Sequence, residues 1–322
     1  MTDIAITPAA AAAPAAAESL DALCELDRAG FFPAPGESVP DFLDRVNAVR
    51  SRHEIFEQEL ADKGSAEVFE AFTVNSSDRI APELLQEAWE LTDRLYGFKV
   101  SHVPGFYLTS KVGLLWGGCM LSDPDEGLSI FLLRGAFRKK RQFLNYKRDE
   151  LLAHELCHSV RQQLNEPTLE EYFAYQTSDR PLRRYLGNCF ISDRDALLFL
   201  LPMLLLPAAG FVKAFWLPAF PVWIFWLLAM VYPLFLLWRN HTSRQVVMAA
   251  KKALHSLKVK RCDALLFRCT VDELKTLASF RGKPAEFHDF VTRRAANSPR
   301  WAVMAQRFIF TDNNLEEQNE NS

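Results

Sequence analysis

The chain has 322 residues, of which 37 are Lys or Arg and 40 are Asp or Glu, and its net charge is −3. This balance excludes a generally basic nucleic-acid-binding protein, so we expect no nucleic-acid partner. The six cysteines form no CxxC pair, which is typical of buried thiols in a reducing compartment rather than of a disulfide scaffold. These features predict no particular oligomeric state.

The N-terminal part of the chain predicts a leader followed by helices. Residues 1–36 are rich in Ala and Pro, and we expect them to form a disordered leader. Apolar residues then recur with helical spacing between Pro40 and Gly64, and a second helix is expected from Pro82 to Tyr96.

Strand-like segments come next. Short runs rich in β-branched, aromatic and Leu residues occupy 103–108, 112–121 and 128–136, and the segment 122–127 is a strong turn signal. We therefore expect a small, largely antiparallel sheet that contains a hairpin. The glycines in Trp116-Gly117-Gly118 permit close backbone approach, so an exposed strand there would be able to pair with an extended peptide.

Helical signals return after the sheet. A basic run at 138–148 suits anionic lipid headgroups as well as it suits a solvated segment. A helix is predicted from Arg148 to Leu164, the segment 165–167 ends it, and Thr168 is expected to cap another helix through Gln176. Together these elements predict an α+β domain over residues 37–190.

An apolar block follows at 195–239. Its residues 196–238 contain a single charge, Lys213, and are long enough for about two crossings of a bilayer. We expect a transmembrane hairpin of two helices, 196–212 and 215–238, although five prolines also allow a re-entrant or interfacial arrangement. Cations flank both ends of the block, so the positive-inside rule places the N- and C-terminal regions in the cytoplasm. A bacterial-type cytoplasmic membrane is the simplest host for this integral membrane protein.

The remainder of the chain is expected to be a helical cytosolic region at 241–310. Thr270-x-x-Glu273 has the spacing of a capping box at the start of one of its helices. The acidic, polar tail at 311–322 is expected to be disordered.

One motif points to metal chemistry: His154-Glu155-Leu156-Cys157-His158, an HExxH sequence. On a helix, residues four apart share a face, so both imidazoles would aim at one point, as Zn²⁺ requires. Leu152, Leu156 and Val160 would face the core. Glu155 would stand beside the metal, where a general base for a zinc-activated water belongs.

A catalytic zinc needs a third protein ligand. The candidates are Glu166, Glu170 and Glu171, and we favour Glu171, since the turn at 165–167 returns the next helix beside the first. Glu170 is the next choice. Thr168-x-x-Glu171 is also a capping-box spacing, and a carboxylate in that role would not be free to hold zinc.

The motif pair His154-Glu155-x-x-His158 and Glu171-x-x-Ala174 resembles the gluzincin zinc metallopeptidases. The resemblance covers about Arg148 to Tyr175 and implies a zincin-like fold. It also implies that two His and the downstream Glu bind Zn²⁺ and that the motif Glu activates water. Several membrane-bound gluzincins have Asp after this Ala, where the present chain has Tyr175.

Three further residues are candidates for contacts with the substrate or the transition state: Arg161, Tyr175 and His102. Pairing of Arg161 with Glu166 or Glu170, and ordinary packing of Tyr175 and His102, are the alternatives.

The leading hypothesis is a membrane-anchored, zinc-dependent peptidase that acts on a peptide or protein substrate and has the lipid bilayer as a partner. The alternative is a non-catalytic, membrane-anchored interaction module with a structural or vestigial metal site. A metal-independent lipid-binding protein is a third hypothesis.

Overall fold

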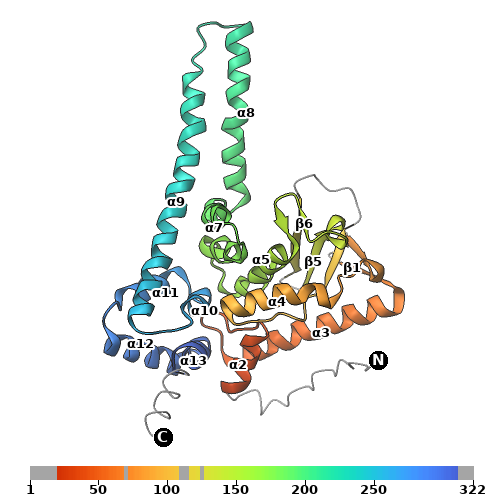
Figure 1. Ribbon diagram of the computed structural model, residues 1–322, viewed down its shortest axis with the longest axis vertical. Coiled ribbons are helices and arrows are strands. Elements are labelled where there is room, and N and C mark those ends of the chain that lie inside the picture. Colours follow the sequence, from red (N-terminus) through yellow and green to blue (C-terminus); the bar gives the residue numbers. More distant parts are fainter. Residues whose placement is uncertain (1–19, 69–71, 109–115, 124–126, 311–322) are drawn as a thin grey trace.

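The computed structural model describes residues 20–68, 72–108, 116–123 and 127–310. A mixed helical and stranded body carries a long two-helix hairpin that projects from one side (Figure 1). The predicted tail at 311–322 and the first nineteen residues of the predicted leader lie outside the described residues.

The N-terminal part begins with helix α2 (Leu20–Arg28). This helix corrects the expectation of a disordered leader for its residues, because Leu23, Cys24 and Asp27 are buried. Helix α3 (Val39–Lys63) starts after Ser38, whose side chain caps it, and ends at Gly64, which has a φ of 72°. Strands β1 (Ser65–Val68) and β2 (Phe72–Asn75) then form a hairpin, and helix α4 spans Pro82–Tyr96 as predicted.

The largest sheet among the described residues has three strands, in the order β3-β5-β4. Strands β4 (Gly118–Asp123) and β5 (Leu128–Arg134) form the predicted antiparallel hairpin. Strand β3 (Gly105–Leu108) pairs with β5 in parallel, so the sheet is mixed rather than largely antiparallel. Between β3 and β5 the chain makes β4, which leaves β3 running in the direction of β5.

A short hairpin, β6 (Gln142–Phe143) and β7 (Tyr146–Lys147), leads into helix α5 (Arg148–Arg161). A 3-10 turn over 162–164 and a left-handed Asn165 (φ 48°) end the helix, as the sequence predicts. The return segment consists of 3-10 turns on either side of helix α6 (Glu170–Ala174), and helix α7 spans Pro181–Leu186.

The projecting hairpin consists of helices α8 (Asp193–Phe215) and α9 (Trp223–Ser256). Both helices are long and apolar enough to cross a membrane. At a rise of 1.5 Å per residue, α8 measures about 35 Å, which suffices for a hydrocarbon core of about 30 Å. Each helix is continuous through its prolines, and α9 extends well past the apolar block into the body (Figure 1).

The C-terminal helices are α10 (Cys262–Phe267), α11 (Val271–Ser279), α12 (Pro284–Asn297) and α13 (Pro299–Ala305), followed by a π-helical turn at 306–310. The predicted capping box of Thr270 and Glu273 is present. These helices share one hydrophobic core with α4 and α5. The ring of Phe267 stacks on Tyr96 at 4.2 Å, and buried Arg268 donates to Asp27 of α2 at 2.7 Å.

Candidate metal centre

Helix α5 presents two different faces. Leu152, Leu156 and Val160 are fully buried in the shared core, as their spacing predicts. The polar face carries His154 and His158, which lie one turn apart with ring centroids 4.8 Å from each other. The apolar face thus holds the helix in place and aims both imidazoles at the return segment.

Three ligand atoms converge at this face. The Nε2 atoms of His154 and His158 are 3.2 Å apart, and the carboxylate oxygens of Glu171 lie 3.5 Å and 3.4 Å from them. Tetrahedral Zn²⁺ with bonds of about 2.0–2.1 Å separates its ligand atoms by about 3.3 Å. The donor set and its spacing therefore fit this ion, and His154, His158 and Glu171 are the group of described residues suited to hold it.

Glu171 reaches this point from α6. The helix that contains it starts without a side-chain cap, so Thr168 does not form the capping box that would have occupied the carboxylate. Ala174, one turn later, is fully buried, and its small side chain lets α6 lie close against α5. The return segment is shorter and more irregular than the single helix predicted from Thr168 to Gln176.

Glu170 has a different position from its neighbour. Its Oε2 lies 3.5 Å from Nδ1 of His158, the nitrogen that faces away from the three-atom cluster. Its Oε1 accepts a hydrogen bond from Nε of Arg161 at 3.2 Å. Burial alone would lower the pKa of His158, but the carboxylates of Glu170, Glu171 and Glu155 raise it. Glu170 is placed to orient a ligand rather than to be one.

His154 is oriented by other groups. Its ring makes a hydrogen bond with the backbone carbonyl of Ala174, and the Tyr175 ring packs edge-on against it at 4.6 Å. Burial, with the nearby His158 and Arg183, lowers the pKa of His154 well below its usual value and keeps the imidazole neutral, as a metal ligand must be.

The position of Tyr175 depends on a glycine. A Cβ atom on Gly187 would lie 2.1 Å from the Tyr175 ring, so no larger residue fits while the ring packs on His154. The start of the segment that follows α7 therefore helps to shape the metal centre.

Glu155 lies between the cluster and the sheet. Its Oε2 accepts a hydrogen bond from the backbone N–H of Met120 at 3.1 Å. Strand β4 is the edge of its sheet among the described residues, and this N–H points away from β5. Burial raises the pKa of Glu155 to about 7, against the lowering effect of His158 and of the Met120 hydrogen bond. This value is close to that of an effective general base near neutral pH.

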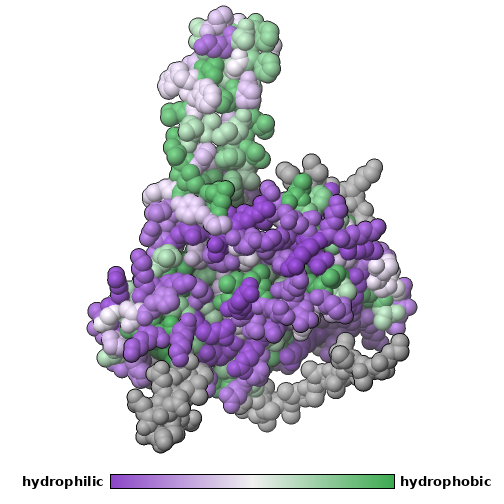
Figure 2. Space-filling model, in the orientation of Figure 1, coloured by the Kyte–Doolittle hydropathy of each residue, from purple (hydrophilic) through white to green (hydrophobic). Residues whose placement is uncertain are grey.

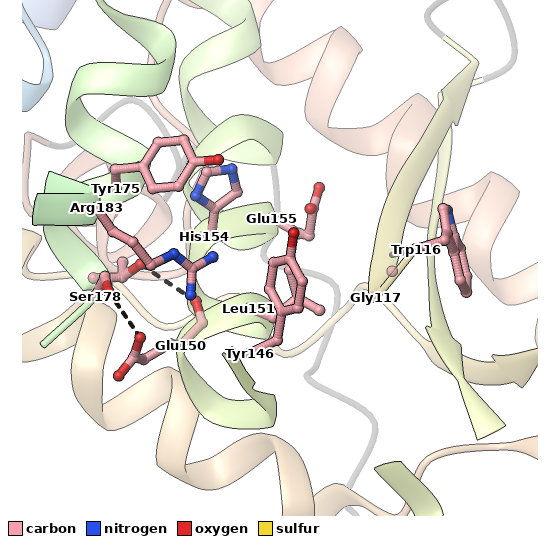
Figure 3. Close-up of a pocket in the computed structure, with 12 residues that line it drawn as sticks. Trp116, Gly117, Tyr146, Glu150, Leu151, His154, Glu155, Tyr175, Ser178 and Arg183 are labelled. Atoms are coloured by element: carbon pink, nitrogen blue, oxygen red, sulfur yellow. Dashed lines mark hydrogen bonds between the residues drawn. The ribbon is translucent and has the colours of Figure 1, made fainter. Parts of the chain in front are cut away.

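A pocket of about 230 Å³ opens beside these groups, and Figure 3 shows its lining. His154 and Glu155 face it from α5, while Tyr175 lies over His154 and Arg183 extends in from α7. Arg183 is the one cation of its lining residues. Its guanidinium packs on Tyr146 at 4.7 Å and donates to the backbone oxygen of Asn145 at 3.1 Å.

Of the three residues proposed to contact a substrate, Tyr175 lines the pocket and the other two do not. Arg161 is fully buried and donates to Glu170 and to the carbonyl of Phe267. His102 stacks on Phe31 at 4.3 Å, away from the metal cluster, and burial lowers its pKa to about 3. Arg161 is therefore paired with Glu170 and His102 packs on Phe31, which were the alternatives stated for these two residues.

The remaining candidate ligand, Glu166, is also directed elsewhere. Its Oε2 accepts from the backbone N–H of Val271 at 3.3 Å, which links the turn after α5 to α11. Trp116, Gly117 and Gly118, proposed as a peptide-binding strand, do line the pocket, and β4 starts at Gly118.

The positions of two residues were not anticipated from the sequence. Arg183 carried no signal beyond its place in a cluster of arginines before the apolar block. Glu170 was the second choice of metal ligand. Its contact with Nδ1 of His158 was not predicted, because that contact depends on the geometry of the turn between α5 and α6. Comparison with known proteins adds nothing to this geometry, since no family model, curated protein or solved structure matches the chain.

Proposed function

We propose that the protein is a membrane-anchored, zinc-dependent peptidase of the zincin type. The observation that carries the proposal is the convergence of His154, His158 and Glu171. The Glu171 carboxylate oxygens lie within 3.5 Å of the two Nε2 atoms, and Glu155 lies beside them at the pocket. The zincin-like fold is part of the proposal, and the edge position of β4 next to α5 supports it.

The proposed ligands are His154, His158 and Glu171. A bound Zn²⁺ would lower the pKa of a water molecule and polarise the scissile carbonyl. Glu155 takes the proton of the attacking water, because its carboxylate lies next to the cluster and has a raised pKa. It then delivers that proton to the amine that leaves.

The charge that develops on the carbonyl oxygen needs a donor on the other side of the pocket. Tyr175 and Arg183 are the side chains that extend there, the first through its hydroxyl and the second through its guanidinium. Both are anchored: Tyr175 packs on His154, and Arg183 packs on Tyr146. We therefore assign them as the donors to the transition state.

The hairpin is proposed to anchor the body. Its helices leave the body on one side and return to it, so the N- and C-terminal regions lie on the same side of the membrane. The cations Arg180, Arg183, Arg184, Arg194 and Arg239 lie at its base, which favours a cytoplasmic body. At the same level, Arg239 donates to the Asp195 carboxylate at 2.6 Å and joins the two helices.

Two measurements on the detergent-purified full chain test the proposal. Elemental analysis is expected to find about one zinc per chain. Wild type and Glu155→Gln are then compared on a mixture of unstructured peptides, with products identified by mass spectrometry. The variant is expected to keep zinc and to lose about 100- to 10,000-fold in rate.

Different failures have different meanings. Zinc without any cleavage by wild type would favour the non-catalytic module with a structural metal. Full activity of Glu155→Gln would refute the role of Glu155. Absence of zinc from protein purified without chelators would refute the metal centre.

A further inference from the structure

Exposed apolar side chains gather on one part of the body. Outside the hairpin, seven large apolar side chains of the described residues are exposed. Five of these lie on the β6–β7 turn, on α7 and just before α8: Leu144, Leu182, Tyr185, Leu186 and Phe190. We refer to these five residues as the root surface, since α7 lies at the root of the hairpin.

Polar contacts join the elements that carry the root surface. Arg180 donates to the Asn145 side chain at 3.0 Å, and Arg183 donates to the Asn145 carbonyl at 3.1 Å, so α7 is tied to the β6–β7 turn. From the other side, Asn240 of α9 donates to the Tyr185 carbonyl at 2.8 Å. The exposed apolar residues therefore sit on rigid supports and not on a loose segment.

The turn itself is built to display an apolar residue. Leu144 has a φ of 50°, in a region that side chains without special stabilisation rarely adopt, and it is 50% exposed. Leu182 and Leu186 are one turn apart on α7, with exposures of 68% and 38%. In water, three exposed leucines on ordered elements contribute no favourable burial of apolar area, whereas at an interface with lipid that area is buried.

The root surface lies on the side of the body from which the hairpin projects. Figure 1 shows α7 at the base of the hairpin and β6 rising on the same side of the body, while α3 runs along the opposite side. In Figure 2 the hairpin is hydrophobic above a body whose surface is largely hydrophilic. The hydrophobic stretch thus starts close to the level of α7.

Cations next to the root surface are opposite in sign to the anionic headgroups of a membrane. Arg184 lies between Leu182 and Leu186 on α7, and Arg194 is exposed in the first turn of α8. At a bilayer interface, exposed leucines enter the acyl boundary while neighbouring guanidinium groups lie at the phosphates.

We propose that the root surface inserts into the headgroup layer of the leaflet that the hairpin enters, and holds the mouth of the pocket at the bilayer surface. This inference rests on the proposed anchoring by the hairpin, but not on catalysis. Tyr146 and Arg183 belong to the β7 and α7 elements of this surface and also line the pocket. Substrates are therefore expected to arrive along the membrane, as segments next to a bilayer.

Spin labels test the proposal on the full chain. Cysteine is introduced at Leu144 or Leu182, labelled with a nitroxide, and the chain is reconstituted in vesicles of phosphatidylcholine with phosphatidylglycerol. Ile55 is the matched control, since it is an apolar residue that is 57% exposed on α3, on the opposite side of the body. Leu204, 68% exposed in the middle of α8, reports the hairpin. Unsubstituted protein corrects for labelling of the native cysteines.

The readout is the accessibility of each label to oxygen relative to a water-soluble nickel complex. Labels at positions 144 and 182 are expected to show an oxygen-to-nickel ratio several-fold above that at 55, and between the values at 55 and 204. Equal ratios at 144, 182 and 55, with a high ratio at 204, would overturn the inference and leave the anchor intact. A low ratio at 204 would overturn the anchor and the inference together.

Discussion

Substitution of Glu170 by Gln tests whether Glu170 is itself a metal ligand or a residue that orients the ligand His158. The Glu170 carboxylate contacts Nδ1 of His158 at 3.5 Å and accepts from Arg161 at 3.2 Å, and it does not join the three-atom cluster. Loss of such an orienting carboxylate weakens metal binding by about 10- to 100-fold, which corresponds to about 1.4–2.8 kcal/mol. The Gln side chain keeps an acceptor for Arg161, so the fold should persist.

The assay is competition for zinc against a chromophoric chelator, with detergent-purified protein at fixed pH. Glu171→Gln is the contrasting variant, because it removes a charged oxygen from the cluster itself, and it should lose more than 100-fold. Glu166→Gln is the matched control, since its carboxylate bonds to the Val271 amide and should not affect zinc. Unchanged affinity in Glu170→Gln would refute its orienting role. Retention of zinc by Glu171→Gln, with loss in Glu170→Gln, would reverse the ligand assignment.

Three further predictions follow from particular contacts. Gly187→Ala should keep zinc but reduce turnover, because the added Cβ would displace the Tyr175 ring; unchanged steady-state rates would contradict this positioning. Chelation should lower the midpoint of thermal unfolding and zinc should restore it, since the ion binds the folded state; a chelator-insensitive midpoint would contradict a preformed site. Glu273→Gln should destabilise the body by about 3–5 kcal/mol at neutral pH, because it leaves the buried Arg300 guanidinium without its counter-charge. Burial would raise the pKa of Glu273, but Arg300 and hydrogen bonds lower it overall, so this stabilisation should fade as the pH falls below about 4.5. A gap between wild type and variant that does not narrow in acid would contradict this assignment.

Helix α5, which carries the HExxH motif, was predictable because local signals agreed. The signals were the HExxH spacing, the apolar residues on the opposite face and the turn at Asn165. Each depends only on residues within a few helical turns of one another in the sequence. The same holds for α4, whose predicted bounds are confirmed, and for the β4–β5 hairpin. The length and composition of the apolar block likewise suffice to predict two helices able to span a membrane.

Other features depend on residues distant in sequence. Helix α2 is ordered because Asp27 binds Arg268 and Arg307, more than 240 residues away, and no local pattern in an Ala-rich segment reports that. The spacing around Arg161 suggested a residue near the substrate, but the carbonyl of Phe267 draws its guanidinium into the core. Strand β3 pairs in parallel because β4 lies on the other side of β5.

The shared core also has a consequence for the order of events during synthesis. Phe267 contacts Tyr96 and Phe173, and its carbonyl accepts a hydrogen bond from Arg161. The packing behind helix α5 is therefore completed by residues that follow the hairpin. A ribosome that has made the metal motif must still make both apolar helices before it supplies these partners. The body therefore reaches its final packing only after the hairpin has emerged and had the opportunity to enter a bilayer. A chain arrested before Phe267 would carry every proposed zinc ligand and still lack the support that holds them in place.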